Sequence, residues 1–212
     1  KSKMIVNALH GKGSKDRVKL GEGVYKQWGI AKDGFDVISN QFSIHYFFKS
    51  NLSVNEFIRN CAENCKLGGY CIGTCYDGNR IFNALKTKKK GDSIFYLKKD
   101  KKIWSIKKMY DHETFENNES CLGYDIEVYQ ESINKNFIEY LVNFEYFTTL
   151  MLNYGFALLS TSEANDIGLP SSMGSFELLY NKMQSEIESK TLSTKYLGES
   201  MNMSEEEKNI SF

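Results

Sequence analysis

The sequence is poor in proline and histidine, with one proline, Pro170, and three histidines among 212 residues. It has no apolar run near the roughly 18 residues that a membrane-spanning helix requires. Its first residues also lack the apolar segment of a secretory signal peptide. These absences predict a globular protein that acts without a membrane anchor. With 41% hydrophobic and 25% charged residues, the composition is ordinary for such a protein.

The five cysteines do not form a disulfide framework, because their number is odd and their spacing is irregular. We expect reduced thiols in an intracellular, cytoplasmic protein. Two C-x3-C pairs could suggest zinc, but one is expected on a helix and the other on a strand. Packing in the core is the favoured interpretation, and we assign no metal ligand. The cysteines are Cys61, Cys65, Cys71, Cys75 and Cys121.

The net charge is zero, but the lysines are concentrated in one segment. Ten lysines lie between Lys86 and Lys108, against two aspartates, whereas residues 111–145 are acidic. A solvated hairpin would explain this pattern, and so would a surface that contacts the phosphate backbone of a nucleic acid. The lysines expected at such a surface are Lys98, Lys99, Lys101 and Lys102.

One segment has the pattern of a strand, a helix and a second strand. FDVISN (35–40) is an apolar strand, and SVNEFIRNCAENCK (53–66) has apolar residues at helical spacing. The helix is expected to begin with a capping box formed by Ser53 and Glu56. YCIGTC (70–75) is a second buried strand. A strand–helix–strand unit of this length predicts a parallel pair in an α/β sheet.

The rest of the chain predicts helices and antiparallel strands. The first 34 residues are rich in glycine and lysine and are expected to be loop with one short helix at 24–28. Charged turns separate the strands expected after residue 90, which favours antiparallel pairing. The further elements expected are helices at 79–87, 136–153, 175–190 and 204–210, and strands at 93–97, 103–109, 122–129 and 156–161.

The first strand ends in an unusual mixture of amides, hydroxyls, imidazole and aromatic rings, in the sequence DVISNQFSIHYFF. Ligands of open α/β sheets sit at the carboxyl ends of the strands. Gln41, Ser43 and the nearby Thr74 offer hydrogen bonds, and His45 can donate one. The aromatic rings offer flat faces for stacking. This set favours a planar, polar heterocycle as the ligand over a nucleophile–base pair.

The same residues resemble a known family. QFSIHYFF resembles the QF-x-x-HY motif of the mRNA cap guanine-N7 methyltransferases, and LGGYCIGTCYDGNRIFNAL is similar to the strand and helix that follow it. GYDIEVY, FIEYLVNFEYF and NYGFALL match later blocks in order. The resemblance covers roughly residues 18–185 and is strongest to the capping enzymes of large DNA viruses. It implies an α/β, Rossmann-like class I S-adenosylmethionine-dependent methyltransferase sheet, with a lysine-rich antiparallel insertion at about 88–130.

The resemblance also implies roles for individual residues. Glu139 would accept hydrogen bonds from the N1–H and exocyclic amine of guanine. No residue would act as a general base, because catalysis would be mostly positioning. The implied cofactor is S-adenosylmethionine, near Gln41, Phe42 and Ser43. The implied contacts to the cap guanine are Phe42, His45, Tyr46, Tyr76, Tyr124 and Glu139. The implied partners are capped RNA and other capping-enzyme domains of the same polypeptide, in the host cytoplasm or virion if the protein is viral.

The sequence departs from the family pattern in three places. The glycine-rich cofactor loop is missing, since Gly11-Lys12-Gly13 follows no apolar strand and is expected to be a flexible turn. Tyr76 replaces a proline of the family, as in viral members. The chain also stops about where the family has its last strand. We therefore expect residues 1–212 to be one partial methyltransferase domain. The alternative is a non-catalytic RNA- or partner-binding module that retains the fold.

Overall fold

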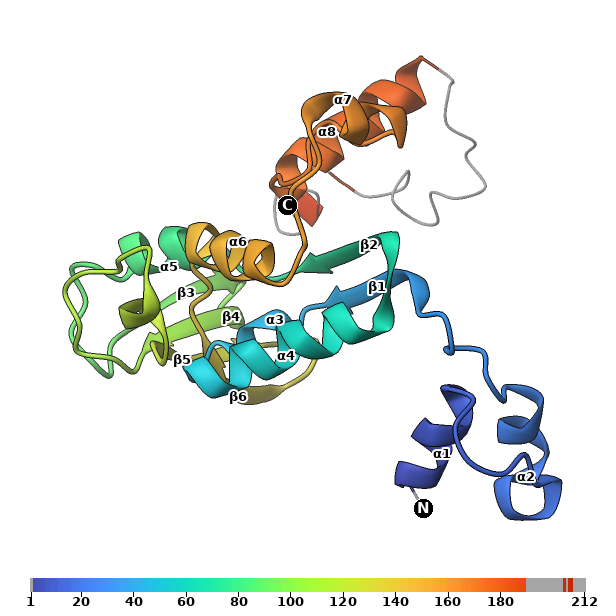
Figure 1. The fold of residues 1–212 in the computed structure, drawn as a ribbon. Helices are drawn as coiled ribbons and strands as arrows, with labels where there is room; N and C mark the ends of the chain where they lie inside the picture. The colour runs from blue at the N-terminus through green and yellow to red at the C-terminus, as the bar shows by residue number, and fades with distance from the viewer. Residues whose placement is uncertain (1, 190–203, 205, 208–212) are drawn as a thin grey trace. The chain divides into compact units, whose positions relative to one another are not determined.

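The computed structural model describes residues 2–189, 204, 206 and 207 (Figure 1). The chain forms two compact units, residues 1–156 and residues 157–212, which are described separately below. The single domain over 1–212 therefore remains a prediction. Within the described residues, no helix combines the length and apolarity needed to cross a bilayer.

The predicted parallel pair is confirmed in the first unit. Strands β1 (Phe35–Gln41) and β2 (Cys65–Thr74) are parallel, and helix α4 (Asn51–Asn64) connects them. Gln41 pairs with Thr74, so both strands end at the same edge. Directly after β1 the chain forms the short helix α3 (Ile44–Phe47). The structure is therefore α/β around this edge, as predicted.

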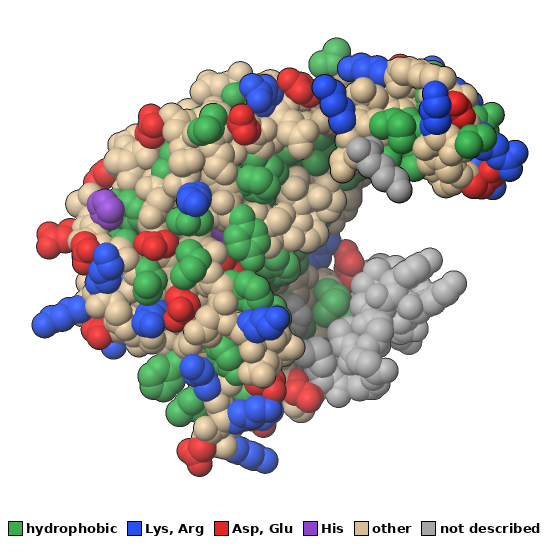
Figure 2. All heavy atoms as spheres, turned by 90° about the horizontal axis from the view of Figure 1, so that it is seen from below, with side chains coloured by type: hydrophobic (Ala, Val, Ile, Leu, Met, Phe, Trp, Pro, Cys, Tyr) green, Lys and Arg blue, Asp and Glu red, His purple; other side chains and the backbone are tan. Residues whose placement is uncertain are grey.

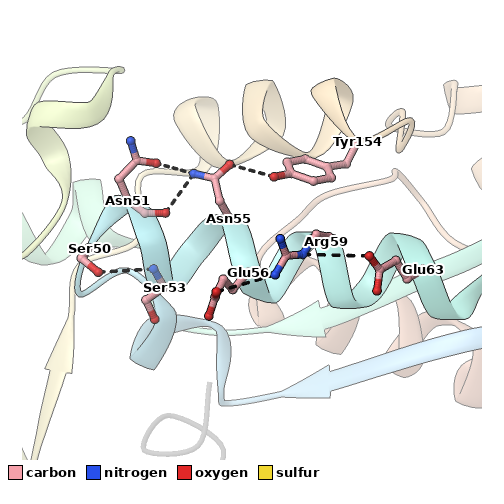
Figure 3. A network of polar contacts seen from close by, with 8 residues as sticks. All are labelled: Ser50, Asn51, Ser53, Asn55, Glu56, Arg59, Glu63 and Tyr154. Carbon is pink, nitrogen blue, oxygen red and sulfur yellow. Dashed lines mark hydrogen bonds and ion pairs between the residues drawn. The ribbon is translucent and has the colours of Figure 1, made fainter. Parts of the chain in front are cut away.

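Helix α4 begins earlier than predicted. The oxygen of Ser50 accepts a hydrogen bond from the backbone N–H of Ser53 at 3.3 Å (Figure 3). The capping box predicted for Ser53 and Glu56 is therefore wrong, because Ser50 supplies the cap and Glu56 lies 3.6 Å from Arg59 instead. On the opposite side of this network, the Tyr154 hydroxyl donates to the Asn55 side chain at 3.2 Å (Figure 3).

The antiparallel sheet is also confirmed, although it extends past the expected insertion. Its strand order is β3-β4-β5-β6, and all three pairings are antiparallel. The strands span residues 93–140 rather than about 88–130. They are β3 (Ser93–Lys98), β4 (Lys101–Lys108), β5 (Asp125–Gln130) and β6 (Lys135–Tyr140).

The long helix predicted at 136–153 is wrong in its first half. Residues Lys135–Tyr140 form β6, and helix α6 covers only Phe144–Asn153. The left-handed backbone of Asn134 (φ 54°) closes the turn that returns the chain from β5. The fully buried Asn143 then caps α6 by accepting from the N–H of Tyr146 at 3.1 Å. The apolar residues whose spacing predicted one helix are therefore divided between the strand β6 and the helix α6.

The second unit contains helices α7 (Thr161–Asp166) and α8 (Phe176–Glu188). The strand predicted at 156–161 is wrong, because Ser160 and Glu163 form a capping box that starts α7 there. Ser175 caps α8, as predicted. The helix predicted at 204–210 lies outside the described residues, except for residues 204, 206 and 207.

The first 34 residues contain more helix than predicted. Helix α1 spans Ser2–Leu9 and helix α2 spans Arg17–Lys26. The Asp16 carboxylate accepts from the backbone N–H groups of Val18 and Lys19, at 2.9 and 3.2 Å, which starts α2. The prediction rested on the glycine and lysine content of the region. It overlooked the apolar residues of SKMIVNAL in α1 and the capping signal at Asp16 before α2.

Two hydrophobic cores meet at the end of β6. Leu141 packs in one core and the next residue, Val142, packs in the other. Because neighbouring residues of an extended chain point to opposite sides, this segment joins the two sheets. The core around α4 contains Ile44, Phe48, Val54, Ile58 and Val142. The core under helix α5 (Gly78–Ala84) contains Ile81, Leu85, Tyr124, Ile126 and Leu141.

The junction between the cores predicts a strict requirement for glycine at the start of α5. The N–H of Gly78 donates to the Val142 carbonyl at 3.0 Å, and a Cβ added to Gly78 would lie 2.4 Å from that oxygen. We expect Gly78→Ala to lower the free energy of unfolding by about 1–3 kcal/mol. Gly23→Ala is the control, since its Cβ would meet no atom within 4 Å. Chemical denaturation measures both, and equal stability of the two variants would contradict the prediction.

Candidate functional site

The site begins at the carboxyl ends of β1 and β2, which side-chain hydrogen bonds hold together. The Thr74 hydroxyl donates to the Gln41 side-chain oxygen at 2.8 Å, and the Gln41 nitrogen donates to the Ser39 hydroxyl at 3.0 Å. The backbone N–H of Phe42 donates to the Thr74 carbonyl at 2.9 Å. The sequence prediction that Gln41 and Thr74 line one edge is therefore confirmed.

The turn from β1 into α3 presents two further predicted residues. Phe42 has a left-handed backbone (φ 48°), which costs a non-glycine residue of order 1–3 kcal/mol. Phe42 is 51% exposed. Ser43 occupies the N-cap position of α3, but its side chain makes no capping hydrogen bond. The turn thus presents an aromatic ring and a hydroxyl at the strand edge without using either to build the helix.

A buried pair of ionisable side chains lies behind this edge. His45 on α3 is 3% exposed and Glu139 on β6 is 7% exposed, and the His45 Nε2 and Glu139 Oε2 atoms are 3.6 Å apart. Both ring nitrogens of His45 and this oxygen of Glu139 are buried without a hydrogen-bond partner. Buried polar atoms are nearly always paired in folded proteins. Three unpaired atoms at one place therefore indicate a site that a polar ligand completes.

The pair is not a stable ion pair, because burial disfavours both charges. Burial lowers the pKa of His45 to about 4 and raises the pKa of Glu139 to about 7. Near neutral pH the imidazole is therefore uncharged and the carboxyl group is close to its midpoint. A ligand that donates hydrogen bonds to Glu139 would shift this balance towards the carboxylate.

Two tyrosines flank the pair. The ring of Tyr46 lies 4.3 Å from the His45 ring, edge to face, and the ring of Tyr76 lies 6.4 Å from it, nearly parallel. Tyr46 is 44% exposed, so the site opens to solvent beside it. Burial, and then the charge of Glu139, raise the pKa of both phenols, which stay neutral. The side-chain nitrogen of Gln130 on β5 donates to the Tyr76 hydroxyl.

Tyr124, the remaining residue expected at the cap, lies in the core under α5. Its ring is only 2% exposed, and its hydroxyl donates to the Thr114 carbonyl at 2.9 Å. The contacts of this ring therefore show a packing role, and its contact with the cap stays a prediction. The aromatic rings around it are Phe82, Tyr110, His112 and Phe115.

Sequence reasoning missed Gln130, which holds the Tyr76 hydroxyl across two sheets. Nothing local in the sequence marks this contact, because Gln130 ends β5 whereas Tyr76 follows β2. Glu139 was identified only through the family resemblance. Its place opposite Ile126 follows from the β5–β6 register, which a predicted helix could not give.

Part of the lysine-rich segment is neutralised within the chain. Lys99 and Asp100 form the tight turn between β3 and β4, both with positive φ. Lys101 pairs with Glu131, and the Lys102 ammonium lies 4.5 Å from the centre of the Tyr129 ring. On the face in Figure 2, Lys and Arg side chains mix with Asp and Glu instead of forming one patch. Both interpretations of the lysines stay open.

The chain is similar to several known capping proteins. It is 35% identical to the probable mRNA-capping enzyme of Acanthamoeba polyphaga mimivirus over 47% of this chain and 8% of that protein. It is 30% identical to the mRNA cap guanine-N(7) methyltransferase of Saccharomyces cerevisiae over 61% of this chain and 30% of that one. It is 40% identical to the mRNA cap guanine-N(7) methyltransferase of Caenorhabditis briggsae over 28% of this chain and 16% of that one. The chain thus spans less than a third of these relatives.

The family comparison covers far more of the chain than these pairwise matches. Residues 14–211 match the family described as the mRNA (guanine-N(7))-methyltransferase domain. This range includes β1, β2 and β6, and with them every residue of the buried site. The chain therefore belongs to the mRNA (guanine-N(7))-methyltransferase domain family.

Proposed function

We propose that this chain binds the guanine of an RNA cap and positions its N7 atom for methylation. The observation that carries the proposal is the buried His45–Glu139 pair, with its unpaired polar atoms between aromatic rings. Names of relatives and the family match support the same reaction. The protein would be a methyltransferase of mRNA capping, with capped RNA as its substrate.

The site suits guanine because of the donors on that base. Guanine presents an N1–H and an exocyclic amine on one edge, and the Glu139 carboxylate can accept from both. The imidazole of His45 has a nitrogen that can donate to the neighbouring carbonyl of the base. Tyr46 supplies an exposed aromatic face beside this position. A site with buried, unpaired polar groups also discriminates strongly against ligands that leave them unpaired.

The proposed methyl donor is S-adenosylmethionine, at the edge formed by Gln41, Phe42 and Ser43. These residues fit one side of such a cofactor, since the Ser43 hydroxyl is not used for capping and the Phe42 ring is exposed. The Gln41 amide keeps one donor and one acceptor after its bonds to Thr74 and Ser39. When bound, the cofactor supplies a methyl group on a positively charged sulfur.

The residues of this chain would then act by positioning. N7 of guanine carries a free lone pair, so methylation there needs no general base. Glu139 fixes the edge of the base, and Tyr46 fixes the plane of its ring. Holding two reactants in such a geometry can lower a barrier by roughly 7–11 kcal/mol. This explains why a site with a buried acid and imidazole needs neither as a proton acceptor.

We propose that other capping-enzyme domains accompany this chain in one cytoplasmic polypeptide. The matched segment makes up only 8% of the mimivirus relative. The face of β1 and β2 that α4 does not cover exposes Val37, Tyr70 and Ile72, whereas parallel sheets are normally covered on both faces. All five cysteines are free thiols, which supports a reducing compartment.

The first test of the proposed function replaces the carboxylate with an amide. Glu139→Gln keeps the shape of the side chain but cannot accept both guanine donors, so methyl transfer to capped RNA should fall about 30- to 1,000-fold. This corresponds to about 2–4 kcal/mol for a lost buried, charge-assisted contact. Glu127→Gln is the control, because Glu127 pairs with Lys107 on the neighbouring strand. Wild-type rates in the Glu139 variant would rule out its role.

A second prediction concerns stability and pH. Between pH 4.5 and about 7, Glu139 is protonated in the folded chain and ionised in the unfolded chain. Unfolding then releases a proton, so this residue lowers stability as pH rises. Glu139→Gln should therefore gain stability relative to wild type over this range, by about 3 kcal/mol at most. Denaturation at several pH values measures the difference, and a constant difference would contradict the raised pKa.

The lysine hairpin gives a third prediction. Replacing Lys98, Lys99, Lys101 and Lys102 together with alanine should weaken binding of capped oligonucleotides and flatten its salt dependence, if they contact phosphates. Binding of a bare cap dinucleotide should stay nearly unchanged. Equal losses for both ligands would show that the hairpin acts through stability of the fold.

A further inference from the structure

The first two helices and the segment after them form a small, tightly connected structure, which we call the α1–α2 module (residues 2–33). The backbone N–H of Gly29 donates to the Ala8 carbonyl at 2.8 Å, and that of Ala31 donates to the Leu9 carbonyl at 2.9 Å. A Cβ on Gly11 would lie 3.5 Å from the Cα of Gly29. The loop after α1 is therefore anchored at its base.

A cavity of about 390 Å³ lies within this module. Three of its lining residues, Met4, Ala8 and Leu20, are apolar, and Lys3, Lys12 and Gly13 also line it. Gly13 has φ 83°, and a Cβ there would meet no atom within 4 Å, so the backbone faces open space. The lining residues are Lys3, Met4, Asn7, Ala8, Lys12, Gly13, Ser14 and Leu20.

The two lysines of the cavity differ from the other cations of the module. Four of those others lie next to carboxylates: Arg17 and Lys26 by Glu22, Lys19 by Asp16 and Lys32 by Asp33. A fifth, Lys15, lies 5.3 and 5.4 Å from the ring centres of Tyr25 and Trp28. Within residues 2–189, no ion pair is formed by Lys3 or Lys12. Lys3 and Lys12 are therefore the two cations of the module with neither a carboxylate nor an aromatic ring beside them.

We propose that this cavity binds one phosphate and the adjoining nucleoside of a single-stranded RNA chain. Lys3 and Lys12 would contact the phosphate, and the open backbone at Gly13 would let it approach closely. The apolar side chains of Met4, Ala8 and Leu20 would lie against the sugar or base. An RNA chain suits the site because each of its nucleotides joins a compact anion, the phosphate, to a flat ring system, and the family to which the chain belongs is described as acting on mRNA.

This site is separate from the proposed cap site, since none of its residues belongs to β1, α3 or β6. It also differs from the cofactor loop of a Rossmann-like domain, because Gly11-Lys12-Gly13 follows helix α1 rather than a strand. The sequence analysis expected a plain turn at Gly11-Lys12-Gly13. It did not predict the cavity that Lys12 and Gly13 line.

The test measures binding of an uncapped RNA oligonucleotide by fluorescence anisotropy at several salt concentrations. Lys3→Ala/Lys12→Ala should weaken binding about 5-fold near 0.1 M salt, because losing the contact with one phosphate removes about 0.7 from the salt slope for single strands. Lys26→Ala/Lys32→Ala is the matched control, with the same change in charge on the same module. Lys3→Arg/Lys12→Arg should restore binding.

The outcomes separate this proposal from its competitors. Equal losses in the two alanine pairs would overturn it, since only the total charge would then matter, and so would no loss in either pair. Competition by adenosine monophosphate as strong as that of the oligonucleotide would overturn the assignment to an RNA chain. Because the oligonucleotide carries no cap, failure of the cap proposal would leave this result unchanged.

Discussion

The arrangement of this chain depends on one buried contact, in which His45 and Glu139 face each other at 3.6 Å without completing their hydrogen bonds. Desolvating a carboxyl group and an imidazole costs free energy unless something pairs with them. The two cores that meet at Leu141 and Val142, directly after β6, offset that cost by burying apolar side chains. Glu139 lies two residues before Leu141. The packing of the two cores therefore holds it in a buried position that is unfavourable for a carboxyl group by itself.

Each partner reaches the contact by a different constraint. The left-handed turn at Phe42 bends the chain out of β1, so that α3 places His45 behind the strand edge. Antiparallel pairing with β5 sets the register of Glu139. The close approach of Gly78 to Val142 then joins the two sheets. The site is thus assembled from two sheets and supported by tertiary contacts, and the proposed positioning mechanism requires such support.

The sequence predicted the strand edge well and the second half of the site poorly, for physical reasons. Parallel strands end at one edge, so the convergence of Gln41 and Thr74 followed from the strand–helix–strand pattern alone. Glu139 was placed on a helix because apolar residues from Phe137 onwards fit a helical period as well as an extended one. The helix begins only after Asn143 because the buried side chain of Asn143 makes hydrogen bonds, including one of 3.2 Å to the Glu116 carbonyl. Such a partner is distant in sequence and leaves no local signal.

The proposed role of Glu139 also bears on how a guanine site would discriminate against adenine. Adenine presents an acceptor nitrogen where guanine presents N1–H, so the lone pair of adenine would face a buried carboxylate. The carboxyl group could meet it only by keeping a proton, and it could then no longer accept two donors. Guanine would instead favour the ionised form that burial opposes, and its binding would give the unpaired Glu139 oxygen a hydrogen-bond partner. In the proposed site, the free-energy cost of the unpaired Glu139 oxygen would thus favour guanine over adenine, because a base with two adjacent donors removes that cost and adenine does not.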